Sequence, residues 1–118
     1  MGISVAIGAF GAHGLKDILQ RTQRLETFET AVKYQFYHSL AILFLGLLMI
    51  HFQHKLLNTA GGFFIAGILI FSGSLYILSL TGIKWLGAIT PIGGLAFIIG
   101  WILAFMALLQ YSSPQQQL

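Results

Sequence analysis

The stretch Leu40-Ala41-Ile42-Leu43-Phe44-Leu45-Gly46-Leu47-Leu48-Met49-Ile50 contains no polar side chain, and it decides the fold class. It lies inside an uncharged segment at 34–54, and two longer uncharged segments follow at 56–83 and 85–118. A helix needs about 20 apolar residues to cross the hydrocarbon core of a bilayer. All three segments are long enough, so the sequence predicts three helices that span a membrane.

The composition of the 118-residue chain excludes most other protein classes. Apolar residues make up 57% and charged residues 8%, whereas a soluble domain carries about 25% charged residues. A soluble fold and a disordered chain are therefore excluded. The chain has no cysteine, so it has no disulfide, thiolate metal site or cysteine nucleophile. A net charge of +3 from so few groups is too weak to indicate nucleic-acid binding.

Capping residues and Pro91 set the expected helix boundaries. Asn58 and Thr59 are suitable N-caps for the third apolar segment, and Gly82 is a typical helix stop. Pro91 fits the first turn of a helix capped by Thr90; a longer helix from Trp85, kinked at the proline, is the alternative. We predict one all-α membrane domain, 1–118: helix 1 at about 1–13, an amphipathic segment at 16–33, helix 2 at 34–54, helix 3 at 60–81, helix 4 at 91–110 and a polar tail at 111–118.

The first apolar stretch is too short to cross a bilayer alone. As a helix, residues 1–12 would reach only about 18 Å. We expect a helix that is truncated or that inserts partway against its neighbours. The predicted fold is thus a multi-pass bundle of four hydrophobic helices, the first of them short.

Residues 16–33 have an amphipathic pattern. Ile18, Leu25, Phe28 and Val32 recur at helical spacings, and Thr22 is a plausible N-cap. One interpretation is a helix lying along the headgroups, and the other is the solvated first turns of helix 2. We expect a surface segment that continues into the spanning helix near 34–37.

The distribution of Lys and Arg predicts the orientation. Five of the six bases lie in two connections on one side of the predicted bundle, and the sixth, Lys55, lies on the other. Connections rich in Lys and Arg face the cytoplasm. The Lys16–Lys33 loop and Lys84 are therefore predicted to be cytoplasmic, with both termini on the opposite side.

Small residues recur at four-residue spacing, which favours close helix packing. In lipid, apolar area no longer drives association, and small residues let helix backbones approach each other. The predicted packing positions are Gly8 and Ala12 in helix 1, Gly62 and Ala66 in helix 3, and Gly93, Gly94, Gly100 and Ala104 in helix 4.

The histidines are the candidates for chemistry. His13 and His38 are predicted near the cytoplasmic boundary, where they could meet; Tyr34 shares a helix face with His38, and Glu29 lies about two turns earlier. We predict a polar clasp between helices 1 and 2, with a metal or proton site as the alternative. His51 and His54 are also spaced to hold a metal, although two histidines at a helix end explain that pattern as well.

Three blocks resemble a known family. Gly8-Ala9-Phe10-Gly11-Ala12-His13-Gly14-Leu15 resembles the opening signature of the domain of unknown function 423 family, small membrane proteins related to transmembrane protein 256. The remaining matches are Phe28, Ala31, Tyr34-Gln35 and His38, then Thr90-Pro91-Ile92-Gly93-Gly94 with Gly100-Trp101. The resemblance implies a four-helix membrane protein of bacteria, and hence a bacterial inner membrane, but no established activity. Relatives usually carry a longer apolar lead, so helix 1 looks shortened.

No residue set here is arranged for catalysis, so we expect no enzyme activity and no cofactor. The leading hypothesis is a small helix-packing or accessory subunit of a homo-oligomer or a larger membrane complex. One alternative is a transporter or channel-like protein built on the Thr90–Gly94 interruption and the histidines. Another is a metal or proton site at His13 and His38.

Overall fold

The computed structural model describes residues 1–111, and this part of the chain consists of helices joined by short connections, without a strand. The all-α prediction is confirmed. The predicted polar tail lies, apart from Tyr111, outside the described residues. In chain order the elements are α1 (Gly2–His13), α2 (Lys16–Arg21), α3 (Leu25–His51), α4 (Lys55–Gly67), a π-helical turn η1 (Ile68–Ser72), α5 (Gly73–Thr81), a 3-10 turn η2 (Lys84–Ala88) and α6 (Thr90–Tyr111).

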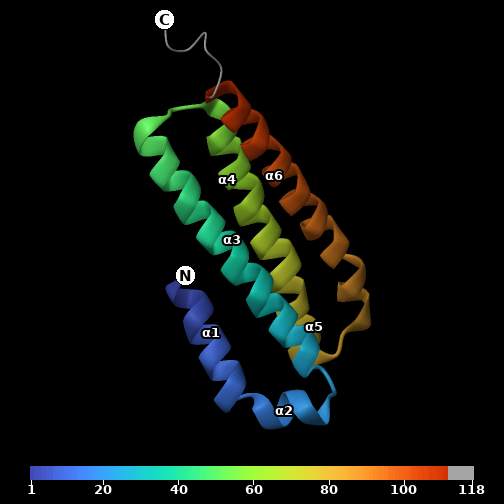
Figure 1. Cartoon of the computed structure of the whole chain (residues 1–118). Helices are drawn as coiled ribbons and strands as arrows, with labels where there is room; N and C mark the ends of the chain where they lie inside the picture. The colour runs from blue at the N-terminus through green and yellow to red at the C-terminus, as the bar shows by residue number, and fades with distance from the viewer. Residues whose placement is uncertain (112–118) are drawn as a thin grey trace, which may run out of the picture.

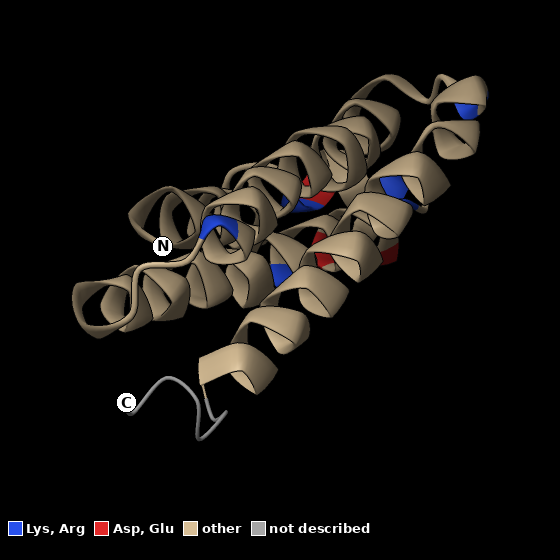
Figure 2. Cartoon of the chain, turned by 90° about the horizontal axis from the view of Figure 1, so that it is seen from above, with Lys and Arg blue, Asp and Glu red and all other residues tan. Residues whose placement is uncertain are grey.

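Three long rods form the bundle. They are α3, the continuous α4–η1–α5 helix, and α6, which lie side by side in Figure 1. The segments Leu25–His51, Lys55–Thr81 and Lys84–Tyr111 are each long and apolar enough to cross a membrane. Long parts of these helices carry no Lys, Arg, Asp or Glu (Figure 2), and large apolar side chains cover their outer surface. That distribution fits lipid as the solvent.

Helix α1 lies beside only one half of α3. Its N-terminus reaches the middle of α3 in Figure 1, where the Ser4 and Ser39 hydroxyl oxygens are 3.5 Å apart. Lower down, Gly11 packs directly against the ring of Phe28, and a Cβ at Gly11 would overlap that ring. The expected packing of helix 1 against its neighbours is therefore present, and its partial insertion into the membrane stays a prediction.

The predicted amphipathic segment is divided into two helices. The chain turns at Gln23, whose φ is 56°, and this left-handed residue ends α2. Thr22 does not cap the next helix as predicted, because its hydroxyl donates to the carbonyls of Ile18 and Leu19. Ile18 is 47% exposed and Leu19 is fully buried, so the face of α2 that packs inward differs from the predicted one.

Helix α3 begins at Leu25, nine residues before the predicted start of helix 2. Phe28 and Ala31 are buried against neighbouring helices, so packing continues the helix through the charged stretch. Glu26 lies in the first turn, where a carboxylate interacts favourably with the helix dipole. Residues 25–33 are therefore the first turns of α3, whereas the sequence predicts a surface segment that continues into the spanning helix only near 34–37.

Helix α4 begins at Lys55, before the predicted Asn58–Thr59 cap. The His54 ring is the cap, because its Nδ1 accepts a hydrogen bond from the backbone N–H of Leu56 at 3.0 Å. Thr59 instead donates to the carbonyl of Lys55. At the other end Gly82 adopts φ 74° and terminates α5, as predicted.

Helix α6 begins at Thr90, so the kinked helix from Trp85 is not formed. The η2 turn supplies the predicted connection between Gly82 and Ile89. The Thr90 hydroxyl lies 3.3 Å from the Leu86 carbonyl and 2.7 Å from the Ser74 hydroxyl, which ties the start of α6 to α5. Pro91 occupies the first turn, where its missing N–H costs nothing.

Candidate functional site

His38 is the most deeply placed ionisable residue among the candidates. It is the fourteenth of the 27 residues of α3 and is 5% exposed. Its Nδ1 lies 2.9 Å from the carbonyl oxygen of Tyr34, and the indole Nε1–H of Trp101 on α6 donates to its Nε2 at 3.0 Å. An indole N–H only donates and a carbonyl only accepts. The imidazole is therefore neutral, with its proton on Nδ1, and both ring nitrogens have partners.

Aromatic rings from α4 and α6 surround this histidine on α3. The Phe97 ring of α6 stacks on the imidazole with centroids 3.5 Å apart and planes 10° apart. The Phe64 ring of α4 meets its edge at 5.4 Å, and Trp101 meets Phe64 at 4.8 Å. We call His38, Phe64, Phe97 and Trp101 the central cluster. Each ring contact adds to the burial of apolar area, so the cluster fixes the register of α3, α4 and α6.

A second set of hydrogen bonds joins α3 to η1 and α5. The Tyr76 hydroxyl donates to the Gln35 side-chain oxygen at 2.5 Å, and the Ser72 hydroxyl donates to the Ala31 carbonyl at 2.8 Å. Hydrogen bonds within a membrane bundle connect helices because lipid offers no substitute partner. Among the described residues no fully buried side-chain nitrogen or oxygen lacks a partner.

The predicted clasp between helices 1 and 2 is not formed by the predicted pair. His13 is exposed at the end of α1, and no hydrogen bond joins it to His38 in residues 1–111. His38 is remote from the helix boundary because α3 starts nine residues earlier than predicted. Glu29 is exposed and has no contact with His38; of the candidates, only Tyr34 lies against it, with ring centroids 6.2 Å apart.

The alternative of a metal site is not supported by a cluster of ligand side chains in residues 1–111. Within the described part of the chain no three His, Asp or Glu side chains converge. His54 has another role besides capping: its Nε2 lies 2.5 Å from the Gln110 side-chain oxygen, which links the start of α4 to the end of α6. His51 is exposed at the end of α3.

The predicted packing positions are partly correct. A Cβ at Gly100 would lie 2.7 Å from the Phe64 ring, and one at Gly93 would lie 2.8 Å from the Cα of Phe71. Ala104 is buried in the same interface. Gly8 approaches Val32, with 3.3 Å between an added Cβ and the valine Cγ1. These positions hold helices at close range inside the chain.

The other predicted packing positions do not lie in tight internal contacts. Gly62 points outward, and a Cβ there would meet nothing within 4 Å. Ala66 is half-buried and Ala12 is exposed. Gly94 has only ordinary van der Waals space beside Phe71. Gly67 and Gly11 are closely packed instead. The face of each helix that packs inward therefore differs from the one that four-residue spacing predicts.

The Thr90–Gly94 segment is not an unwound binding site. It forms the first turn of α6 and packs against the π-helical turn, with Gly93 under the backbone of Phe71. A π-helical turn inserts an extra residue and widens the helix locally. Because Gly93 has no side chain, the widened turn and α6 lie in direct backbone contact.

Three important residues were not singled out as a site from the sequence. From the sequence, Trp101 and Gln35 enter only through the family resemblance, and Tyr76 is not singled out. Their partners are 63 and 41 positions away in the sequence, so spacing cannot connect them. The available sign was their chemistry: a Trp or Gln within an apolar helix needs a hydrogen-bond partner.

Comparison with known proteins identifies the family. Residues 7–94 match the model described as "Protein of unknown function (DUF423)". A UPF0382 membrane protein of Staphylococcus aureus is 48% identical over 93% of this chain and 88% of its own length. The UPF0382 membrane protein YwdK of Bacillus subtilis is 46% identical over 92% of this chain and 89% of its length. No solved structure matches the chain. The chain is an integral membrane protein that belongs to the DUF423 family.

Proposed function

We propose that this protein is a small non-enzymatic packing subunit of a homo-oligomer or a larger membrane complex. The proposal is that it acts through helix contacts within the bilayer. The Gly62 face carries this proposal: Gly62, Ile65 and Leu69 lie on successive turns of the α4–η1–α5 helix and point outward. Ile65 is 52% and Leu69 is 70% exposed.

The contrast between internal and external glycines supports the proposal. Gly67, Gly93 and Gly100 allow close contacts inside the chain, and a Cβ at any of them would overlap a neighbour. Gly62 has the same small surface with no neighbour in residues 1–111. Small residues on exposed membrane helices permit close approach by another helix. The central cluster gives no comparable support for another function. Both ring nitrogens of His38 have hydrogen-bond partners, and the surroundings of the cluster are apolar.

Cross-linking in native membranes tests the Gly62 face directly, since the chain contains no cysteine. We expect Ile65→Cys to form an adduct with a bifunctional maleimide, and Gly62→Leu in the same chain to abolish it by blocking close approach. Ile98→Cys is the matched control, because Ile98 is 57% exposed on α6. An adduct of twice the chain mass indicates an oligomer, and another mass indicates a different subunit. Equal linking at both positions, or none at Ile65→Cys, contradicts the proposal.

We further propose that the membrane is a bacterial inner membrane and that the α2 end of the bundle is cytoplasmic. The relatives are bacterial membrane proteins, and α2 and the lower end of α5 lie at one end of the bundle in Figure 1. Lys16, Arg21, Arg24 and Lys84 belong to segments at that end, and Lys55 begins α4 at the other. A bias of this kind sets the orientation of multi-pass proteins.

Labelling of intact cells distinguishes the two orientations. With a membrane-impermeant maleimide we expect Lys55→Cys to be labelled in intact cells and Lys84→Cys only after the membrane is permeabilised. Both side chains are exposed, so accessibility differs only by membrane side. The reverse pattern would show that the α2 end faces outward.

A further inference from the structure

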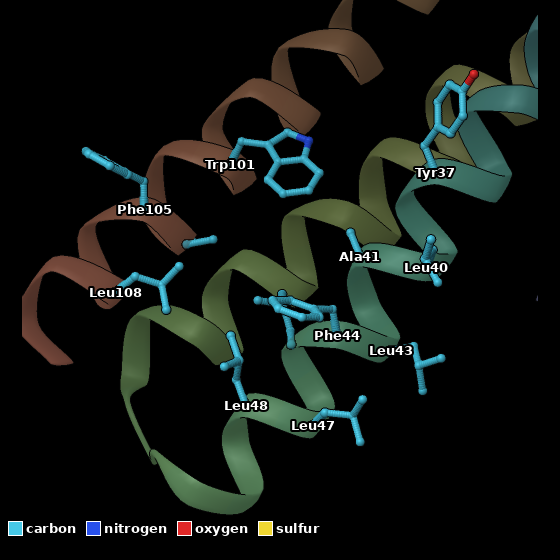
Figure 3. Close-up of a pocket in the computed structure, with 12 residues that line it drawn as sticks. Tyr37, Leu40, Ala41, Leu43, Phe44, Leu47, Leu48, Trp101, Phe105 and Leu108 are labelled. Atoms are coloured by element: carbon cyan, nitrogen blue, oxygen red, sulfur yellow. The ribbon is translucent and has the colours of Figure 1, made fainter. Parts of the chain in front are cut away.

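An apolar groove of about 550 Å³ lies between α3 and α6 and is not filled by the chain (Figure 3). Leu40, Phe44 and Leu48 line one side of it, and Trp101, Phe105 and Leu108 line the other. Volumes of this size are typical of sites that hold a small ligand. The lining is almost entirely hydrocarbon, so the occupant is apolar where it lies in the groove.

One end of the groove lies at the middle of the bundle. Trp101 and Tyr37 lie at that end in Figure 3, and Leu48 and Leu108 lie at the other. The Trp101 indole cannot swing away freely because its N–H donates to His38. The groove therefore runs from the central cluster toward the end of the bundle where α3 stops at His51.

The length of the groove matches one leaflet of a bilayer. From Tyr37 to Leu48 the α3 helix advances eleven residues, about 16 Å at 1.5 Å per residue. Half of a hydrocarbon core of about 30 Å is about 15 Å. A partner helix that packs along the whole membrane thickness would need a groove about twice as long. A single acyl chain ends near the bilayer midplane, so a groove of this length is long enough to hold it.

Two basic residues follow the end of the groove that Leu48 and Leu108 line. His51 is exposed and lies seven residues beyond Phe44, two turns further along the same face of α3. Lys55 follows at the start of α4 and is also exposed, and no ion pair involves it among the described residues. A phosphate at headgroup level would complement these groups.

We propose that the groove binds one acyl chain of a phospholipid from the leaflet at the His51 end. The acyl chain lies along Phe44 and Phe105 and ends against Trp101, and the phosphate lies beside His51 and Lys55. The His38–Trp101 hydrogen bond sets the depth of the site by holding its inner wall. This inference is independent of the Gly62 face, which lies on a different helix.

Native mass spectrometry of the full chain, purified in mild detergent with added dipalmitoyl phosphatidylglycerol, tests the site. We expect one phospholipid per chain to survive delipidation that removes the rest. Ala41→Phe, which fills the groove, is expected to weaken retention of the phospholipid about tenfold, because the acyl chain loses the contacts of several methylene groups. Gly46→Phe is the control, since it adds the same side chain to α3 where an added Cβ meets nothing within 4 Å.

A second variant keeps the test informative if Ala41→Phe misfolds. Phe44→Ala removes a wall residue that is 59% exposed, so it introduces no clash and is expected to weaken retention in the same direction. The proposal is overturned if the unaltered chain retains no lipid, or if Phe44→Ala and Gly46→Phe retain it equally. A lipid-free dimer whose interface includes Phe44 and Phe105 would also overturn it, because a second copy would then fill the groove.

Discussion

Replacement of Gly93 with alanine is expected to lower the free energy of unfolding by about 2–3 kcal/mol, the cost of forcing an extra methyl into a packed interface. The new Cβ would lie 2.8 Å from the Cα of Phe71 and closer still to its backbone nitrogen. Backbone atoms cannot move aside as a flexible side chain can. The α6 helix would have to separate from the π-helical turn, and the Ser74–Thr90 hydrogen bond beside it would lengthen.

The adjacent glycine provides the control. A Cβ at Gly94 would lie 3.8 Å from the Phe71 ring, which is ordinary contact. Gly94→Ala is expected to change stability by no more than about 0.5 kcal/mol, or to stabilise slightly, because alanine favours a helix over glycine. Circular dichroism during reversible unfolding in mixed detergent and dodecyl sulfate measures both variants. Equal stability of the two alanine variants would show that Gly93 makes no close contact with the backbone of Phe71.

Replacement of His38 with alanine is expected to destabilise the bundle by about 3 kcal/mol. The variant loses the stacked contact with Phe97, leaves a cavity among three helices and removes the acceptor for the Trp101 N–H. The same unfolding measurement detects this loss. His51→Ala is the matched control, since His51 is exposed at the end of α3 and its removal is expected to cost little.

A double-mutant cycle separates the hydrogen bond from the packing. His38→Ala and Trp101→Phe are expected to be non-additive by about 0.5–1.7 kcal/mol, the range for polar contacts between membrane helices. With Trp85→Phe as background, Trp101 fluorescence reports the same contact, because loss of His38 frees the indole. Additive single and double variants, with unchanged Trp101 emission, would show that the two rings make no specific hydrogen bond.

Much of the architecture follows from local features of the sequence. The three spanning helices are evident because an apolar run of about 20 residues has no soluble alternative. Gly82 ends α5 because it adopts a positive φ, and Pro91 lies in the first turn of α6, where proline is tolerated. These outcomes depend on one residue or one run at a time.

The candidate site was predicted less well because it depends on how helices face each other. His38 was identified as important, but its predicted partner was His13, and the bundle pairs it with Trp101 instead. The early start of α3 at Leu25 moved His38 to the middle of the helix. That start reflects burial of Phe28 and Ala31, which no local pattern of charge can indicate.

The sequence alone determined that lipid surrounds this protein and how many apolar helices cross it, since both depend on hydropathy summed along the chain. The tertiary structure decided which faces of those helices meet. Gly62 and Gly67 lie five residues apart in α4, about 140° around the helix axis, so Gly67 packs inward while Gly62 points out. Four-residue spacing marks which small residues share a face, but it does not show which face meets a neighbouring helix. The packing of the helices sets which glycines, rings and hydroxyls find partners within the chain.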